Sequence, residues 1–212
     1  MDVDEARDRM QEIQRIMERA TLFTLLPGTA AVAGGLLVLA GCAASYAMFR
    51  SLDFADILGM SLNGQIAFCV MWFAIGVLGV LLEVVLTARA AQRAGLAPAV
   101  RSARVALFSL TPSVVVAMVL TVKFLIPVQP RPEEIQYIVP VWMMLYGTGV
   151  YTAGLFSIRP PRVLGLTFLA MGVVALLGFP HYGVVSAAAS FGLLHIVFGL
   201  YILGKQRQDR AQ

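Results

Sequence analysis

The stretch VLGLTFLAMGVVALLGFPHYGVVSAAASFGLLHIVFGLYILG, residues 163–204, contains no Asp, Glu, Lys or Arg. A membrane-spanning helix needs about 20 apolar residues, so this stretch is too long for one crossing and suits two. Within it, GFPHYG at residues 178–183 combines Pro with Gly and is typical of a tight turn. We therefore expect two spanning helices that run in opposite directions on either side of this turn.

The composition of the whole chain also indicates a membrane protein. Of the 212 residues, 59% are hydrophobic and 13% are charged, and the mean hydropathy is +0.81. A soluble domain of this size could not enclose so much apolar surface in water. Further apolar segments precede the quoted stretch, and short loops make consecutive helices antiparallel neighbours. The fold class we expect is an all-α polytopic bundle, residues 21–204, with six spans at about 22–49, 65–88, 104–128, 135–157, 162–179 and 183–204.

The Lys and Arg residues fall into alternate gaps between these apolar segments. Only Arg50, Lys123 and Arg131 lie on one side, with Lys123 near the end of its span. Short cytoplasmic loops carry an excess of Lys and Arg, so we expect both termini in the cytoplasm and a multi-pass protein of the bacterial inner membrane. The net charge of +4 follows from this placement rather than from a basic face, and we expect no nucleic-acid partner. The gaps on the other side hold Arg7, Arg9, Arg15, Arg19, Arg89, Arg93, Arg101, Arg104, Arg159, Arg162, Lys205, Arg207 and Arg210.

Residues 1–20 predict a cytoplasmic amphipathic helix, and residues 205–212 a cytoplasmic tail. The mixed charges before the first apolar segment do not fit a signal peptide, and we expect no cleavage. Glu5 and Arg9 form a favourable pair one helical turn apart. Because the polar faces carry both signs, protein contact is favoured over a lipid surface. Apolar residues recur at spacings of four and three, and the candidate partner-binding face is Val3, Met10, Ile13 and Met17. Three contacts are possible for this face: the chain's own loops, a coiled coil with a second copy, and a cytoplasmic partner.

Glu83, Lys123 and His195 are the ionisable residues, Tyr and Cys apart, that the expected spans contain. A charge inside a membrane is costly and marks a candidate functional site. Lys123 is near a helix end, where its stem can reach the surface. Glu83 and His195 differ in depth by roughly 6 Å and form a candidate intramembrane polar pair. Either they bond to each other, or each bonds separately to a Ser, Thr, Tyr or backbone carbonyl.

Small residues spaced four apart allow close helix contacts in a membrane. They favour either a tightly packed monomeric bundle or a homodimer formed through a glycine face. Pro112 and Pro140 are expected to kink their helices. The small residues are Ala30, Ala31, Gly34, Gly35, Gly41, Ser45, Gly147, Gly149, Gly154, Ala188 and Gly192.

No pattern in the sequence predicts an enzyme, a cofactor or a metal site. His181 and His195 would be roughly 21 Å apart along one helix, too far to share a haem. Metalloprotease, serine-hydrolase and phosphate-loop motifs are absent. Cys42 and Cys69 are interpreted as small apolar residues, although a disulfide between them stays open.

Two short segments carry a resemblance to a known family. They are IQRIMERAT at residues 13–21 and FGLLHIVFG at residues 191–199. With the order and number of spans, they resemble a family of small bacterial six-helix integral membrane proteins of unknown function. Leu26-Pro27 departs from the small polar residues of that family at the start of the first helix. The resemblance implies no activity or cofactor, and it implies that the cytoplasmic helix and the His195 segment belong to one recurring design.

Two functions are compatible with these patterns. The first is a non-enzymatic regulatory or accessory subunit that acts by protein contacts, with the cytoplasmic helix as its handle and a cytoplasmic protein or a second copy as partner. The alternative is a small-solute or proton-coupled transporter that uses Glu83 and His195, with Pro112 and Pro140 opening a path. The lipid bilayer surrounds the protein in both.

Overall fold

The computed structural model describes residues 28–59, 61–93, 101–125, 132–155 and 159–211, together with Glu5, Arg7, Arg9, Met10 and Ile13. Within these residues every regular element is helical and no strand occurs. The elements are α2 (Gly28–Phe49), α3 (Phe54–Leu58), α4 (Leu62–Arg93), α5 (Arg101–Leu125), α6 (Pro132–Ile135), α7 (Ile138–Leu155), α8 (Arg159–Gly178), α9 (Gly183–Ala187), η1 (Ala188–Leu194) and α10 (His195–Ala211).

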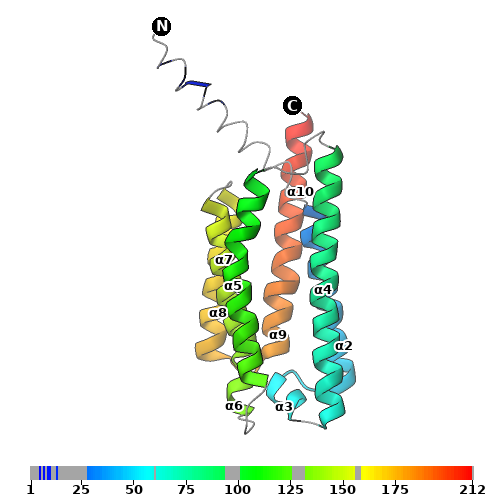
Figure 1. Ribbon diagram of the computed structural model, residues 1–212. Coiled ribbons are helices and arrows are strands. Elements are labelled where there is room, and N and C mark those ends of the chain that lie inside the picture. Colours follow the sequence, from blue (N-terminus) through cyan, green and yellow to red (C-terminus); the bar gives the residue numbers. More distant parts are fainter. Residues whose placement is uncertain are drawn as a thin grey trace.

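The long helices run up and down along one common direction (Figure 1). The short helices α3 and α6 lie at the end opposite to the C-terminal end of α10. In the described part of the chain, five helices are long and apolar enough to cross a membrane, and α5 has a shorter apolar core at Phe108–Phe124. These features confirm an all-helical bundle and suggest a membrane protein.

The described helices differ from the expected spans chiefly at their ends. The expected tail at 205–212 is helical as far as Ala211, because Lys, Gln, Arg and Ala all favour helix. Pro140 lies in the first turn of α7, where its missing N–H breaks no helical hydrogen bond, so the kink predicted there is not required. Pro112 does lie inside α5.

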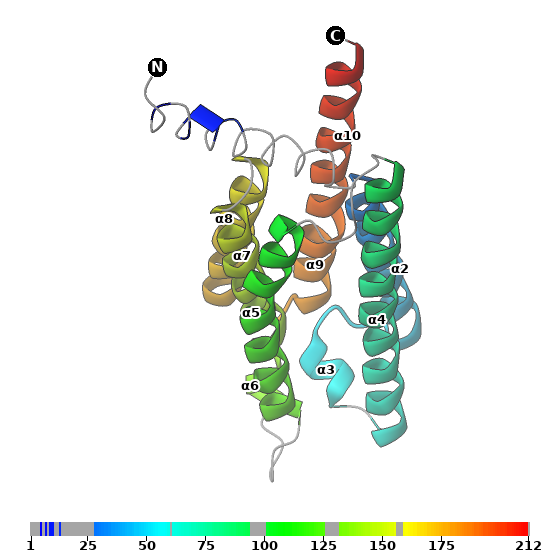
Figure 2. The same ribbon diagram turned by 45° about the horizontal axis from the view of Figure 1, so that its top comes forward.

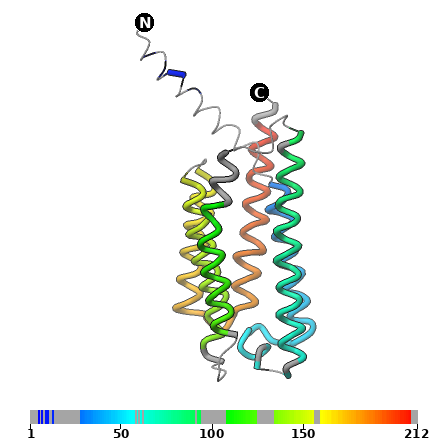
Figure 3. Tube along the Cα trace, viewed as in Figure 1, coloured from blue at the N-terminus to red at the C-terminus, as the bar shows by residue number. Residues whose placement is uncertain are grey.

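The tight turn predicted at residues 178–183 is present. α8 ends at Gly178 and α9 begins at Gly183. The N–H of Tyr182 donates to the carbonyl of Phe179 at 3.1 Å, which closes the turn. After it, α9, η1 and α10 continue one another as one nearly continuous helix (Figure 3).

The bundle consists of two groups of helices, which we refer to as the first and second halves. In the first half, α2 packs against α10, η1 and α4. In the second half, α7 packs against α8 and α5. The expectation that all consecutive helices are neighbours is wrong in two places. α4 and α5 pack in different halves, and so do α8 and the helix formed by α9, η1 and α10 (Figures 1 and 2). The connection between α4 and α5, residues 94–100, lies outside the described residues.

Glycines set the closest helix contacts in both halves. A Cβ atom built on Gly28 would lie 2.5 Å from the carbonyl oxygen of Gly199, and one on Gly35 would lie 2.6 Å from that of Gly192. On α7, a Cβ on Gly147 would lie 2.7 Å from the carbonyl oxygen of Gly165 in α8. These backbones approach so closely because no side chain separates them. The predicted glycines are thus used in contacts within the chain, except Gly34, which has open space beside it.

Candidate functional site

His195 is the first residue of α10 and follows the wide π-helical segment η1. Segments of this kind are rare, and they often occur at functional sites. The ring of His195 stacks on Phe191, with an interplanar angle of 15° and ring centroids 6.2 Å apart. The wide turn therefore positions two rings on the side of the helix that faces the second half.

The hydrogen bond of His195 goes to the other half of the bundle. Its Nε2 lies 2.8 Å from the hydroxyl oxygen of Tyr146 on α7. Phe168 of α8 is fully buried beside this pair and contacts both rings, at centroid distances of 4.9 Å to Tyr146 and 5.2 Å to His195. The two halves are thus joined by a polar contact inside an aromatic cluster.

The second ring nitrogen of His195 is less well satisfied. Nδ1 is buried and has no hydrogen-bond partner. The backbone carbonyls of Ser190 and Phe191 lie near the ring, but not in hydrogen-bond geometry with Nδ1. A buried polar atom without a partner is costly. The imidazole of His195 is therefore held in place mainly by its hydrogen bond to the Tyr146 hydroxyl.

Glu83 lies on α4, in the half of that helix toward Arg93. The hydroxyl of Thr87, one turn further along, donates to Glu83 Oε1 at 3.3 Å. Glu83 is exposed on α4.

The structure does not join the two residues of the predicted polar pair by a hydrogen bond. Glu83 is bonded to Thr87, and His195 is bonded to Tyr146. This is the alternative in which a Thr and a Tyr satisfy the two groups separately. Whether Glu83 and His195 act together stays a prediction. The sequence interpretation missed Tyr146, although a Tyr in an apolar span is itself a polar group that needs a partner.

The predicted partner-binding face is described only in part. Met10 and Ile13 are helical and exposed, at 64% and 56%. Arg9 and Glu5 form the expected ion pair one turn apart, at 2.8 Å. Val3 and Met17 lie outside the described residues. The two described members of the stripe thus leave their apolar surface free for a contact.

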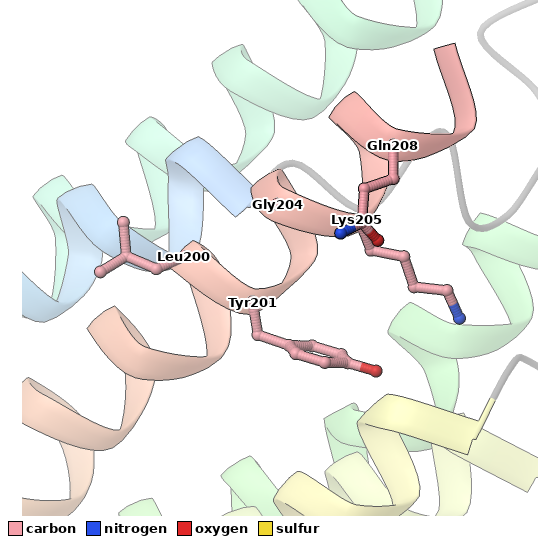
Figure 4. Close-up of a pocket in the computed structure, with 5 residues that line it drawn as sticks. All are labelled: Leu200, Tyr201, Gly204, Lys205 and Gln208. Atoms are coloured by element: carbon pink, nitrogen blue, oxygen red, sulfur yellow. The ribbon is translucent and has the colours of Figure 1, made fainter. Parts of the chain in front are cut away.

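Two surface hollows lie at opposite ends of the first half. One, of about 390 Å³, lies along the last part of α10, where Tyr201 and Lys205 extend from the same side of the helix (Figure 4). The other, of about 430 Å³, lies between the end of α2, α3 and the turn after α8. Neither hollow is lined by Glu83 or His195.

The chemistry of the described residues offers no obvious metal site. Among them, no three His, Cys, Asp or Glu side chains come close enough to hold a metal ion. Cys42 and Cys69 are both free, so the disulfide left open by the sequence is not formed. Cys42 Sγ instead lies 3.6 Å from the carbonyl oxygen of Val184.

Comparison of the chain with protein-family models, with curated proteins and with solved structures gives no match.

Proposed function

We propose that the protein is a non-enzymatic accessory subunit of the bacterial inner membrane that binds a transmembrane helix of a partner protein along α4. One observation carries the proposal. Glu83 is an exposed acidic side chain in an apolar helix, and its hydrogen bond is made within that same helix, to Thr87. Such a group needs a partner, because hydrocarbon cannot solvate a carboxylate.

The surface of α4 supports this reading. Of its described side chains, only Phe68 is buried. Val80, Leu81 and Val84, which surround Glu83 in the sequence, are all exposed. Lipid can cover these apolar side chains, but it cannot neutralise the carboxylate between them. A second transmembrane helix can do both.

The charge of Glu83 selects the kind of partner. The partner helix has to bring a Lys, Arg, His or other hydrogen-bond donor to the depth of the carboxylate. A second copy of this chain fits poorly, because a two-fold contact along α4 would place two Glu83 carboxylates against each other. Lys123 of a second copy lies in the last turn of α5, near the opposite end of the bundle, and cannot reach the depth of Glu83. A different membrane protein is the occupant that the charges favour.

The distribution of cations supports the proposed orientation, with both termini in the cytoplasm. The ends of α4, α8 and α10 that lie at one end of the bundle carry Arg89, Arg93, Arg159, Arg162, Lys205 and Arg207 (Figure 1). At the opposite end, the described cations are Arg50 and Lys123. This asymmetry is typical of cytoplasmic and outer faces, respectively.

Site-specific photo-crosslinking in cells tests the proposal. A crosslinking amino acid replaces Val84, beside Glu83, and a matched control replaces Val174 on α8, since both are 58% exposed. We expect position 84, but not position 174, to capture a membrane protein whose captured segment carries a Lys, Arg or His. Glu83→Leu should lower the yield about tenfold, because it removes a charge-assisted hydrogen bond. An acidic residue at the partner's cation should rescue Glu83→Lys.

Two results would overturn the proposal. One is capture of lipid alone, or of a second copy alone, from position 84. The other is an unchanged yield in Glu83→Leu, since the carboxylate would then contribute nothing to the contact.

The apolar stripe of the N-terminal helix offers the partner protein a second contact. Met10 and Ile13 are exposed, so this part of the stripe is free to bind a soluble region of the partner. Removal of residues 1–19 should weaken capture at position 84 without preventing membrane insertion.

A transporter is the second candidate, and the Tyr146–His195 hydrogen bond favours it. That bond crosses between the two halves, and many carriers move two groups of helices about a site at their interface. In this reading, protonation of the His195 or Glu83 side chain would change the contact between the halves.

A further inference from the structure

We propose that the hollow at the end of the bundle opposite to the C-terminus binds a zwitterion in which an ammonium group is joined to a phosphate, as in an ethanolamine headgroup. Three separate segments form this hollow of about 430 Å³. They are the last turn of α2 with Arg50, the segment that leads into α3, and the turn between α8 and α9. The inference does not depend on a partner helix at α4.

The walls of the hollow are fixed by hydrogen bonds between segments distant in the sequence. The N–H of Val184 donates to the carbonyl of Leu52 at 3.1 Å. His181 Nδ1 lies 3.2 Å from Asp53 Oδ2, and the other oxygen of Asp53 caps α3 by accepting the N–H of Ala55 at 2.8 Å. Asp53 is consequently occupied by the chain itself and is only 19% exposed. It holds the site together and is not the ligand's partner.

Arg50 and Asp56 are the charges free to meet a ligand. Arg50 adopts a left-handed backbone with φ of 55°, which is unfavourable for a residue other than Gly and is often found at functional sites. Its guanidinium carbon lies 6.0 Å from the centroid of the Tyr46 ring. Asp56 is exposed and accepts one hydrogen bond, from the hydroxyl of Ser51 at 3.0 Å. The hollow thus offers one cation and one carboxylate on a fixed frame.

This charge pattern matches a ligand that itself carries both signs. Arg binds phosphate well because its planar guanidinium can donate two parallel hydrogen bonds. Asp56 can accept from an ammonium group, and the exposed ring of Tyr182 in the lining provides an aromatic face for the same cation. A purely anionic ligand would be repelled by Asp56, and a purely cationic one by Arg50.

The position of the hollow suggests the source of the ligand. Arg50 directly follows Phe49, the last residue of the apolar helix α2. If α2 spans the membrane, the hollow lies at the level of the phospholipid headgroups. The shared chemistry is that of phosphoethanolamine, either as the headgroup of phosphatidylethanolamine or as the soluble compound.

Native mass spectrometry of the full chain, released from nanodiscs, tests the proposal. The discs contain equal amounts of phosphatidylethanolamine and phosphatidylglycerol, and a parallel titration uses soluble phosphoethanolamine. We expect retention of phosphatidylethanolamine over phosphatidylglycerol, and about tenfold weaker retention in Arg50→Gln and in Asp56→Asn. Lys123→Gln, which removes a cation near the same end but outside the hollow, should bind as the unmodified chain does. Asp56 is exposed, so Asp56→Asn keeps the test valid if Arg50→Gln fails to fold.

The two sources give different results. Retained lipid that is displaced by the soluble compound identifies the headgroup, whereas binding of the soluble compound alone identifies a soluble ligand. The proposal is overturned if neither binds, if phosphatidylglycerol is preferred, or if Asp56→Asn binds as tightly as the unmodified chain.

Discussion

At the scale of single residues, one hydroxyl group, that of Tyr146, makes a polar contact between the two halves of the bundle. The Tyr146 hydroxyl lies 2.8 Å from His195 Nε2, and the buried ring of Phe168 packs against both residues. A hydrogen bond in such surroundings adds modest stability when it is made, but leaves a costly buried atom when one partner is removed. The pair is therefore a sensitive point in the contact between the two halves.

Tyr146→Phe should destabilise the protein by about 1–3 kcal/mol, because His195 Nε2 would lose its partner while the packing of the ring is kept. The measurement is the thermal unfolding midpoint of the purified protein in detergent. Tyr201→Phe is the matched control, since Tyr201 is exposed and its hydroxyl has no such burial. Joint replacement by Tyr146→Phe and His195→Leu should recover part of the loss. An unchanged midpoint in Tyr146→Phe would contradict this account of the contact.

The same residues separate the two candidate functions. Liposomes that contain the protein and a pH-sensitive dye report proton entry. A transporter would show proton uptake that Glu83→Gln and His195→Asn each reduce at least tenfold. An accessory subunit would show none above empty liposomes, with crosslinking at position 84 still dependent on Glu83.

At the scale of the elements, glycines decide which helices meet. The close contacts repeat every seven residues, at Gly28 and Gly35 against Gly199 and Gly192. The sequence suggested pairs four residues apart, but antiparallel helices that lie nearly along each other bring the same face into contact every seventh residue. Gly34 and Gly35 consequently differ: the first has open space, and the second has none.

Gly35→Ala should lower the free energy of unfolding by about 1–3 kcal/mol, because the added methyl group would lie 2.6 Å from the carbonyl oxygen of Gly192 and force α2 away from η1. Gly34→Ala, its neighbour in the same helix, should be neutral or slightly stabilising, since Ala favours helix more than Gly. Thermal unfolding in detergent measures both variants. Equal effects would show that α2 and η1 are not held at this distance.

At the scale of the whole molecule, the cations and the fold point to one orientation. Labelling with a membrane-impermeant thiol reagent tests it, after Cys42 and Cys69 are replaced by Ala. A cysteine at Ser61, before α4, should react in intact cells, whereas one at Gln208, in α10, should react only after the membrane is opened. The expected asymmetry follows from the excess of Lys and Arg at the α10 end. The reverse labelling pattern would show that the proposed orientation of the chain is wrong.

Much of the fold could be predicted from local features of the chain. The uncharged stretch at residues 163–204 and the turn within it predicted α8 and the α9–α10 helix correctly, since hydropathy and turn residues act over a few neighbours. The candidate site was predicted less well. Glu83 and His195 stood out as polar groups in apolar spans, but their hydrogen-bond partners, Thr87 and Tyr146, did not. Which hydrogen-bond partner each residue finds depends on which helix faces pack against each other, and the sequence alone does not give that packing.

The sequence by itself determined that the chain is a set of apolar helices with a break at Pro180 and with most of its cations in alternate gaps between the helices. Only the tertiary structure decided that α4 and α5 pack in different halves and that Tyr146 bonds to His195. It also decided that Arg50, Asp56 and His181 line one hollow. The physical reason is that apolar helices in a membrane are nearly alike in hydropathy. Their pairing depends on close backbone approach and on a few polar contacts between residues far apart in the chain.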